Sequence, residues 1–188
     1  LSVFLTGLVI KMLDDYNDEE YDKLIGSPNI AVVLGSGIMS YSIFLFSMAC
    51  ILNLNTSVCL FLSSFSLGMT DNLFIKMPSG LRGYQESLIT IIIGLVLFKK
   101  QMLAALLLMS SIQLFDDYFD YNNESFSTKN WAFILGKVEC FLIATILFLM
   151  SLLIDNITAL SAAVSGPLII YIIKLLSLKL TNCTFYTK

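Results

Sequence analysis

The chain has 188 residues, of which 57% are hydrophobic and 13% are charged, and its formal net charge is −3. With a mean hydropathy of +0.83, it carries more apolar surface than a soluble core can bury, which is typical of a protein that crosses a membrane several times. The absence of histidine excludes a histidine-ligated metal and a histidine general base, and the lack of a basic stripe excludes a nucleic-acid partner.

Long apolar runs predict an all-α fold, a multi-spanning bundle of transmembrane helices, because a spanning helix needs about 20 apolar residues. In chain order we expect the end of one helix over 1–13. Further helices are expected over 30–52, 56–75, 87–98, 102–115, 131–154 and 157–178. The polar stretches between them predict acid-rich loops at about 14–29 and 116–130 and a basic loop at about 76–86. Because the chain opens inside an apolar run and closes on a polar stub, we interpret 1–188 as one membrane domain, incomplete at both ends.

Residues 87–115 hold two apolar runs that are separated only by Lys99, Lys100 and Gln101. Two ammonium groups at a membrane centre would be costly, so we favour two spans with the lysines at an interface. Two crossings then lie between the first acidic stretch and the basic loop, and two more lie between the basic loop and the second acidic stretch. An even number of crossings places the two acidic stretches and the basic loop on one side of the membrane. The positive-inside rule makes that side cytoplasmic, and we expect a multi-pass protein of the plasma membrane. The cations on or near that side are Lys11, Lys23, Lys76, Arg82, Lys129, Lys137, Lys174 and Lys179.

Most of the acidic residues lie in two clusters, six of the 14 within residues 14–22 and four within residues 116–124. If a helix continues into each cluster, residues four apart turn by about 400° and form one slowly drifting stripe. The first stripe consists of Asp14, Asp18 and Asp22 with Asp15 beside it, and the second consists of Asp116, Asp120 and Glu124 with Asp117 beside it.

Several carboxylates on one helical face repel each other, so a counter-charge is required. Mg²⁺ suits this role because it takes oxygen ligands and keeps waters or phosphate oxygens as further partners. Two such faces opposed across a cavity would hold a diphosphate with its metals, and Lys76 and Arg82 would bind the outer phosphate oxygens.

Two other interpretations of the acid clusters stay open. Acids that follow a membrane helix can be a solvated loop, although two clusters of matching pattern with a basic loop between them disfavour this. An ion or proton transporter would place acids inside its spans, where Glu139 stands nearly alone.

The stretch DDYNDEEYD, residues 14–22, resembles the N-D-x-x-D-x-x-x-D motif of the UbiA-type intramembrane prenyltransferases, with Asp14 at the position of the Asn. DDYFD, residues 116–120, resembles the second D-x-x-x-D motif of that family, and STKNWAFILG is similar to the polar stretch that leads into its next helix. The interval between the two motifs also agrees, so the chain would run from the end of helix 2 to helix 8 of the family, plus a stub.

The resemblance implies a helical bundle around a central cavity. It also implies a Mg²⁺-dependent prenyltransferase, which ionises a polyprenyl diphosphate among the membrane lipids. An aromatic or lipid acceptor then attacks the allylic cation. A catalytically degenerate member that binds a prenyl lipid, or has a structural role, is the alternative. The carboxylates that the resemblance makes catalytic are Asp15, Asp18, Asp22, Asp116 and Asp120; the further metal ligands are Asp14, Asp117 and Glu124; and the diphosphate ligands are Lys76, Arg82 and Lys129.

Overall fold

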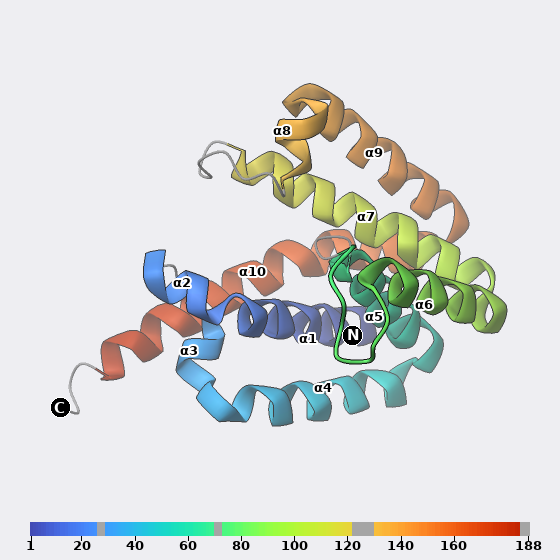
Figure 1. The fold of residues 1–188 in the computed structure, drawn as a ribbon. Coiled ribbons are helices and arrows are strands. Elements are labelled where there is room, and N and C mark those ends of the chain that lie inside the picture. The colour runs from blue at the N-terminus through green and yellow to red at the C-terminus, as the bar shows by residue number, and fades with distance from the viewer. Residues whose placement is uncertain (26–28, 70–72, 122–129, 185–188) are drawn as a thin grey trace. The chain divides into compact units, whose positions relative to one another are not determined.

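The computed structural model describes residues 1–25, 29–69, 73–121 and 130–184 (Figure 1). These described residues form ten α-helices and one short 3-10 turn, η1, and no named strand occurs among them. The predicted all-α class is therefore confirmed. The bounds are α1 Ser2–Asn17, α2 Glu19–Ile25, α3 Ile30–Leu34, η1 Gly35–Gly37, α4 Ile38–Leu52, α5 Leu54–Gly68, α6 Gly83–Phe98, α7 Lys100–Asp120, α8 Trp131–Leu135, α9 Lys137–Ile154 and α10 Asn156–Thr184.

Among the described residues, four stretches are long and apolar enough to cross a membrane, which supports a multi-pass membrane protein. Helices α5 and α6 are apolar but shorter, with 15 and 16 residues. Residues 87–115 hold two separate helices, α6 and α7, which meet at Lys99; that both cross the membrane stays a prediction. The four stretches are Ile30–Leu52, Lys100–Asp120, Lys137–Ile154 and Asn156–Leu176.

Several predicted helices have other bounds in the structure, and the helix expected over 30–52 is interrupted by η1 at Gly35–Gly37. The helix expected over 56–75 ends at Gly68, and Leu73 and Ile75, which raise the hydropathy of that window, are exposed. The helix expected over 131–154 is broken at Gly136, whose φ of 104° favours glycine. Hydropathy reports none of these breaks, because one glycine or a short polar segment changes a window average only slightly.

The chain divides into two compact units, the first made of Leu1–Ser57 with Ser161–Lys188 and the second of Val58–Leu160. Helices α5 and α10 each run from one unit into the other. The first acid cluster belongs to the first unit, whereas the basic loop and the second acid cluster belong to the second. A single membrane domain around a central cavity stays a prediction.

In the first unit, α1 packs against α4 and α3 around an apolar core. Helix α10 approaches α1 closely at Gly7, where an added Cβ would lie 2.8 Å from Cδ1 of Ile169. The same core holds Met12, one turn before the acid-bearing end of α1, and Ile30, the first residue of α3. It therefore fixes where the first acid cluster begins. Its buried side chains are Met12, Ile30, Ala31, Ile38, Ile169 and Ile173.

In the second unit, α7 and α9 lie side by side (Figure 1). The hydroxyl of Ser111 donates to the carbonyl of Ala144 at 2.8 Å, and the hydroxyl of Ser151 donates to the carbonyl of Ala104 at 3.0 Å. All four of these side chains are small and buried. The two backbones therefore approach closely, which is common where helices meet in lipid.

Replacing Ala144 by Leu is expected to destabilise the second unit by about 1–3 kcal/mol, because extra methylene groups force a packed contact apart. Ala144 has 0% of its surface exposed. The measurement is thermal unfolding of the purified protein in detergent. Ala163→Leu is the matched control, since Ala163 is exposed on α10, and an equal loss of stability in both variants would contradict the packing argument.

Candidate functional site

The first acid cluster is helical over most of its length and divides into buried and exposed carboxylates. Asp15, in the last turn of α1, is only 4% exposed. Its Oδ2 accepts a hydrogen bond from the Ile30 N–H at 3.1 Å, and its Oδ1 lies 3.0 Å from Nζ of Lys11. Both oxygens of this carboxylate thus have protein partners.

Asn29 joins the end of α1 to the start of α3. Its Nδ2 donates to the backbone carbonyl of Asp15 at 2.6 Å and to Oδ2 of Asp22 at 2.8 Å. Its Oδ1 accepts from the Ala31 N–H at 2.6 Å, so Asn29 is also the N-cap of α3. The carboxylate of Asp22, a predicted metal ligand, is therefore held by an amide.

The outward face of the first cluster carries Asp14 and Asp18, which are both exposed. They are four residues apart, so they lie on nearly the same side of the helix axis. Lys11 Nζ lies 2.9 Å from Oδ2 of Asp14 and offsets part of the negative charge.

The second acid cluster repeats this arrangement in the second unit. Oδ2 of Asp117 accepts from the Trp131 N–H at 3.1 Å, and Nδ2 of Asn130 donates to the backbone carbonyl of Asp117 at 3.1 Å. Oδ1 of Asn130 accepts from the Ala132 N–H at 2.8 Å and caps α8. Asp116 is exposed and Asp120 is half-buried. Glu124 and Lys129, the other predicted members of the site, lie outside the described residues.

The two arrangements share a short sequence repeat, which the acid motifs do not include. Residues 29–35 read NIAVVLG and residues 130–136 read NWAFILG, so both match N-x-A-x-x-L-G. In each copy the Asn caps a five-residue helix, and the glycine that ends it has positive φ, 52° at Gly35 and 104° at Gly136. A comparison of the chain with itself at an offset of about 101 residues would have found the repeat.

The predicted basic loop is a hairpin in which the two cations lie opposite each other. An isolated antiparallel bridge pairs Lys76 with Arg82, and the Met77 N–H donates to the Leu81 carbonyl at 2.8 Å. Gly80 turns the chain with φ 85°. Opposite side chains in such a pair have Cβ atoms about 5 Å apart, and like charges there are destabilising. An anion between them would relieve that repulsion.

This hairpin and the second acid cluster lie toward the same end of the α6–α7 pair (Figure 1). Helix α6 begins at Gly83, directly after Arg82, and α7 ends at Asp120. Lys99, with φ 47°, reverses the chain between the two helices at the opposite end. Both cations are exposed and form no ion pair within the described parts of the chain.

A further cation lies beside the second acid cluster. Nζ of Lys137 lies 5.3 Å from the ring centroid of Tyr118 and 5.1 Å from that of Tyr121. Phe133 stacks on Tyr121 with ring centroids 4.6 Å apart. The aromatic faces at this end of α7 therefore already accept one positive charge.

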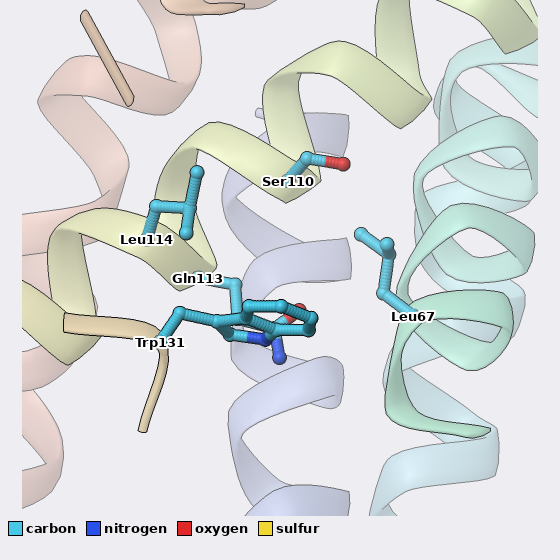
Figure 2. A pocket seen from close by; sticks show the side chains of 5 residues that line it. All are labelled: Leu67, Ser110, Gln113, Leu114 and Trp131. Carbon is cyan, nitrogen blue, oxygen red and sulfur yellow. The ribbon is translucent and has the colours of Figure 1, made fainter. Parts of the chain in front are cut away.

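A cavity of about 160 Å³ lies one turn before the second acid cluster. Figure 2 shows the indole of Trp131 beside the Gln113 side chain on α7, with Leu67 of α5 facing them. Ser110 and Leu114 complete the lining. The backbone N–H of Trp131 donates a hydrogen bond to the Asp117 carboxylate. One wall of this mostly apolar cavity therefore contacts the second acid cluster directly.

The exposed carboxylates suit Mg²⁺ by their chemistry, since the ion prefers oxygen donors and keeps waters and phosphate oxygens in its shell. Across the described ranges, no three Asp, Glu or Cys side chains are grouped so that they would hold a metal ion on their own. A metal bound at either cluster would therefore need further oxygen ligands, such as waters or diphosphate oxygens. The Mg²⁺ ligands stay a prediction.

None of the protein-family models matches this chain, and no curated protein or solved structure matches it either. The likeness to the UbiA-type prenyltransferases therefore stands on the two acid motifs, their interval and the polar stretch after the second motif.

Proposed function

We propose that the protein is a Mg²⁺-dependent prenyltransferase, which transfers a polyprenyl group from a diphosphate to an aromatic or lipid acceptor within the membrane. In this proposal both acid clusters and the cation hairpin face the cytoplasm from the plasma membrane, at the mouth of a central cavity. The observation that carries the proposal is the opposed pair Lys76 and Arg82, which is directed toward the same end of its helix pair as the second acid cluster.

Each group of residues has a defined role in this reaction. When the C–O bond of a prenyl diphosphate breaks, the leaving diphosphate gains negative charge, and bound Mg²⁺ would offset it. Asp14 and Asp18 in one cluster, and Asp116 and Asp120 in the other, would hold the ion. Arg82 binds two phosphate oxygens through its planar guanidinium, while Lys76 offers a point charge.

The cavity beside Trp131 offers a place for an aromatic or isoprenoid group next to the second acid cluster. Its lining is mostly apolar, and Ser110 and Gln113 add polar groups that would orient a ring substituent. An apolar, water-poor wall also protects an allylic cation from attack by water before the acceptor reaches it.

The proposal is tested by diphosphate release from geranyl and longer prenyl diphosphates, with the purified protein in lipid nanodiscs. Release is expected with Mg²⁺ and is lost after treatment with EDTA, and a prenylated product is expected when aromatic or lipid acceptors are added. Tight binding of prenyl diphosphate without release would instead indicate a prenyl-lipid-binding protein. If the protein does not bind prenyl diphosphate at all, the acid clusters have no role in diphosphate binding and are solvated segments.

A further inference from the structure

Asp15 and Asp117 occupy equivalent places in two copies of one local arrangement. Each lies in the last turn of an acid-bearing helix and accepts from the first N–H of a five-residue helix, Ile30 of α3 or Trp131 of α8, in both cases at 3.1 Å. We propose that these carboxylates are positioning residues, which orient the metal-binding acids of their helices, and are not metal ligands themselves. The proposal deepens the prenyltransferase function, and its metal part rests on that function.

The surroundings of Asp15 carry the first part of this proposal. The residue is 4% exposed, and its two oxygens are engaged by the Lys11 ammonium and the Ile30 N–H. A carboxylate buried in this way requires its hydrogen bonds to stay charged. A Mg²⁺ ion that keeps several waters would have to break those bonds to reach it.

The asparagines complete each connection. Nδ2 of Asn29 donates to the carbonyl of Asp15 at 2.6 Å, and Nδ2 of Asn130 donates to the carbonyl of Asp117 at 3.1 Å. One side-chain hydrogen bond from the Asp and one from the Asn therefore join α1 to the start of α3, and α7 to the start of α8. Two such bonds fix the rotation of the helix end as well as its position.

Fixing that rotation decides where the other acids lie. A helix turns by about 100° per residue, so Asp14 and Asp18 lie within about 40° of each other and about 60–100° away from Asp15. The same angles place Asp116 and Asp120 relative to Asp117. Asp14, Asp18 and Asp116 are exposed and Asp120 is half-buried. Each bonded Asp thus turns a pair of acids away from its own contact.

Amide hydrogen exchange, followed by mass spectrometry, tests the connection without any substrate. Asp15→Ala is expected to speed exchange in residues 29–35 about tenfold, and Asp117→Ala in residues 130–136, because each removes a hydrogen bond to a charged acceptor. Each variant should leave the other segment unchanged. Asp15→Asn and Asp117→Asn keep an acceptor oxygen and are expected to restore most of the protection. If an Ala variant does not accumulate, Asn29→Ala or Asn130→Ala carries the measurement.

Binding of Mn²⁺ to the same proteins, measured by electron paramagnetic resonance, separates positioning from ligation. Asp15→Ala is expected to weaken binding about tenfold through the misplaced acids, and Asp15→Asn to restore it. Asp18→Asn, in contrast, should weaken binding as much as Asp18→Ala. Equal losses in Asp15→Asn and Asp18→Asn, or unchanged exchange in the Ala variants, would overturn the proposal.

Hydrogen exchange and Mn²⁺ binding test the positioning role of Asp15 and Asp117 separately from the prenyltransferase reaction. If the wild-type protein binds Mn²⁺ but releases no diphosphate, the prenyltransferase function fails while the positioning role stands. If the wild-type protein binds no Mn²⁺, both metal claims fail, and exchange at residues 29–35 and 130–136 decides whether Asp15 and Asp117 hold the two helix starts.

Discussion

Replacing Asp18 or Asp120 by Ala is expected to lower Mg²⁺-dependent diphosphate release at least about 100-fold, which corresponds to about 2.7 kcal/mol of lost transition-state stabilisation. Each substitution removes one of the two carboxylates that are proposed to hold Mg²⁺ in its cluster. The remaining acid of the pair, Asp14 or Asp116, would hold the ion less tightly. The measurement is initial rate against Mg²⁺ concentration, in which the concentration for half-maximal rate should rise as the maximal rate falls.

Glu20→Ala is the matched control for the first of these variants. Glu20 is an exposed acid of α2, which begins after α1 ends at Asn17, and it is not a member of the Asp14–Asp18 stripe. Its replacement removes the same charge without touching the stripe, so the rate should stay near that of the wild type. A similar loss in Glu20→Ala and Asp18→Ala would mean that overall charge matters and position does not.

Replacing Arg82 by Ala is expected to lower diphosphate release about 100-fold, because a fixed positive charge is lost where the leaving group develops its negative charge. Arg82→Lys should recover only part of the rate, since a lysine cannot bind two phosphate oxygens with a planar fork. The bridge partner, Lys76, makes a further prediction possible. Lys76→Ala relieves the like-charge repulsion across the hairpin, so it should cost activity while leaving the hairpin at least as stable.

Lys100→Ala is the control for the cation variants. Lys100 is exposed at the start of α7, at the opposite end of the α6–α7 pair from the hairpin. It changes the net charge as Arg82→Ala does, and it should leave diphosphate release unchanged. Loss of activity in Lys100→Ala would place the reaction at the other end of the helix pair and would contradict the proposed site.

The helices could be predicted from the sequence wherever the apolar runs are long. The separate helices α6 and α7 agree with expectation, and the stretch 30–52 is helical apart from its break at Gly35, because hydropathy and the cost of burying two lysines act over many residues. The breaks at Gly35 and Gly136 could not be predicted from hydropathy. They depend on positive φ at a single glycine, which a hydropathy average over many residues does not register.

Within the candidate site, the acids could be found from the sequence but not told apart. Spacing places Asp14, Asp15 and Asp18 on adjoining parts of one helix, and all three have the same chemistry. Which of them is buried depends on where Asn29 and Ile30 return after the intervening residues. The pairing of Lys76 with Arg82 was likewise out of reach, because it depends on how the chain turns at Gly80.

The serines between α7 and α9 have a consequence for biogenesis. Before the helices associate, the hydroxyl of Ser111 or Ser151 can donate to a carbonyl one turn earlier in its own helix. Each helix can therefore leave the translocon alone with its polar group satisfied. Pairing then exchanges one hydrogen bond for another, and such exchanges between membrane helices are worth only about 0.6 kcal/mol on average. Insertion and assembly of this helix pair can thus proceed as separate steps, of which the assembly is reversible.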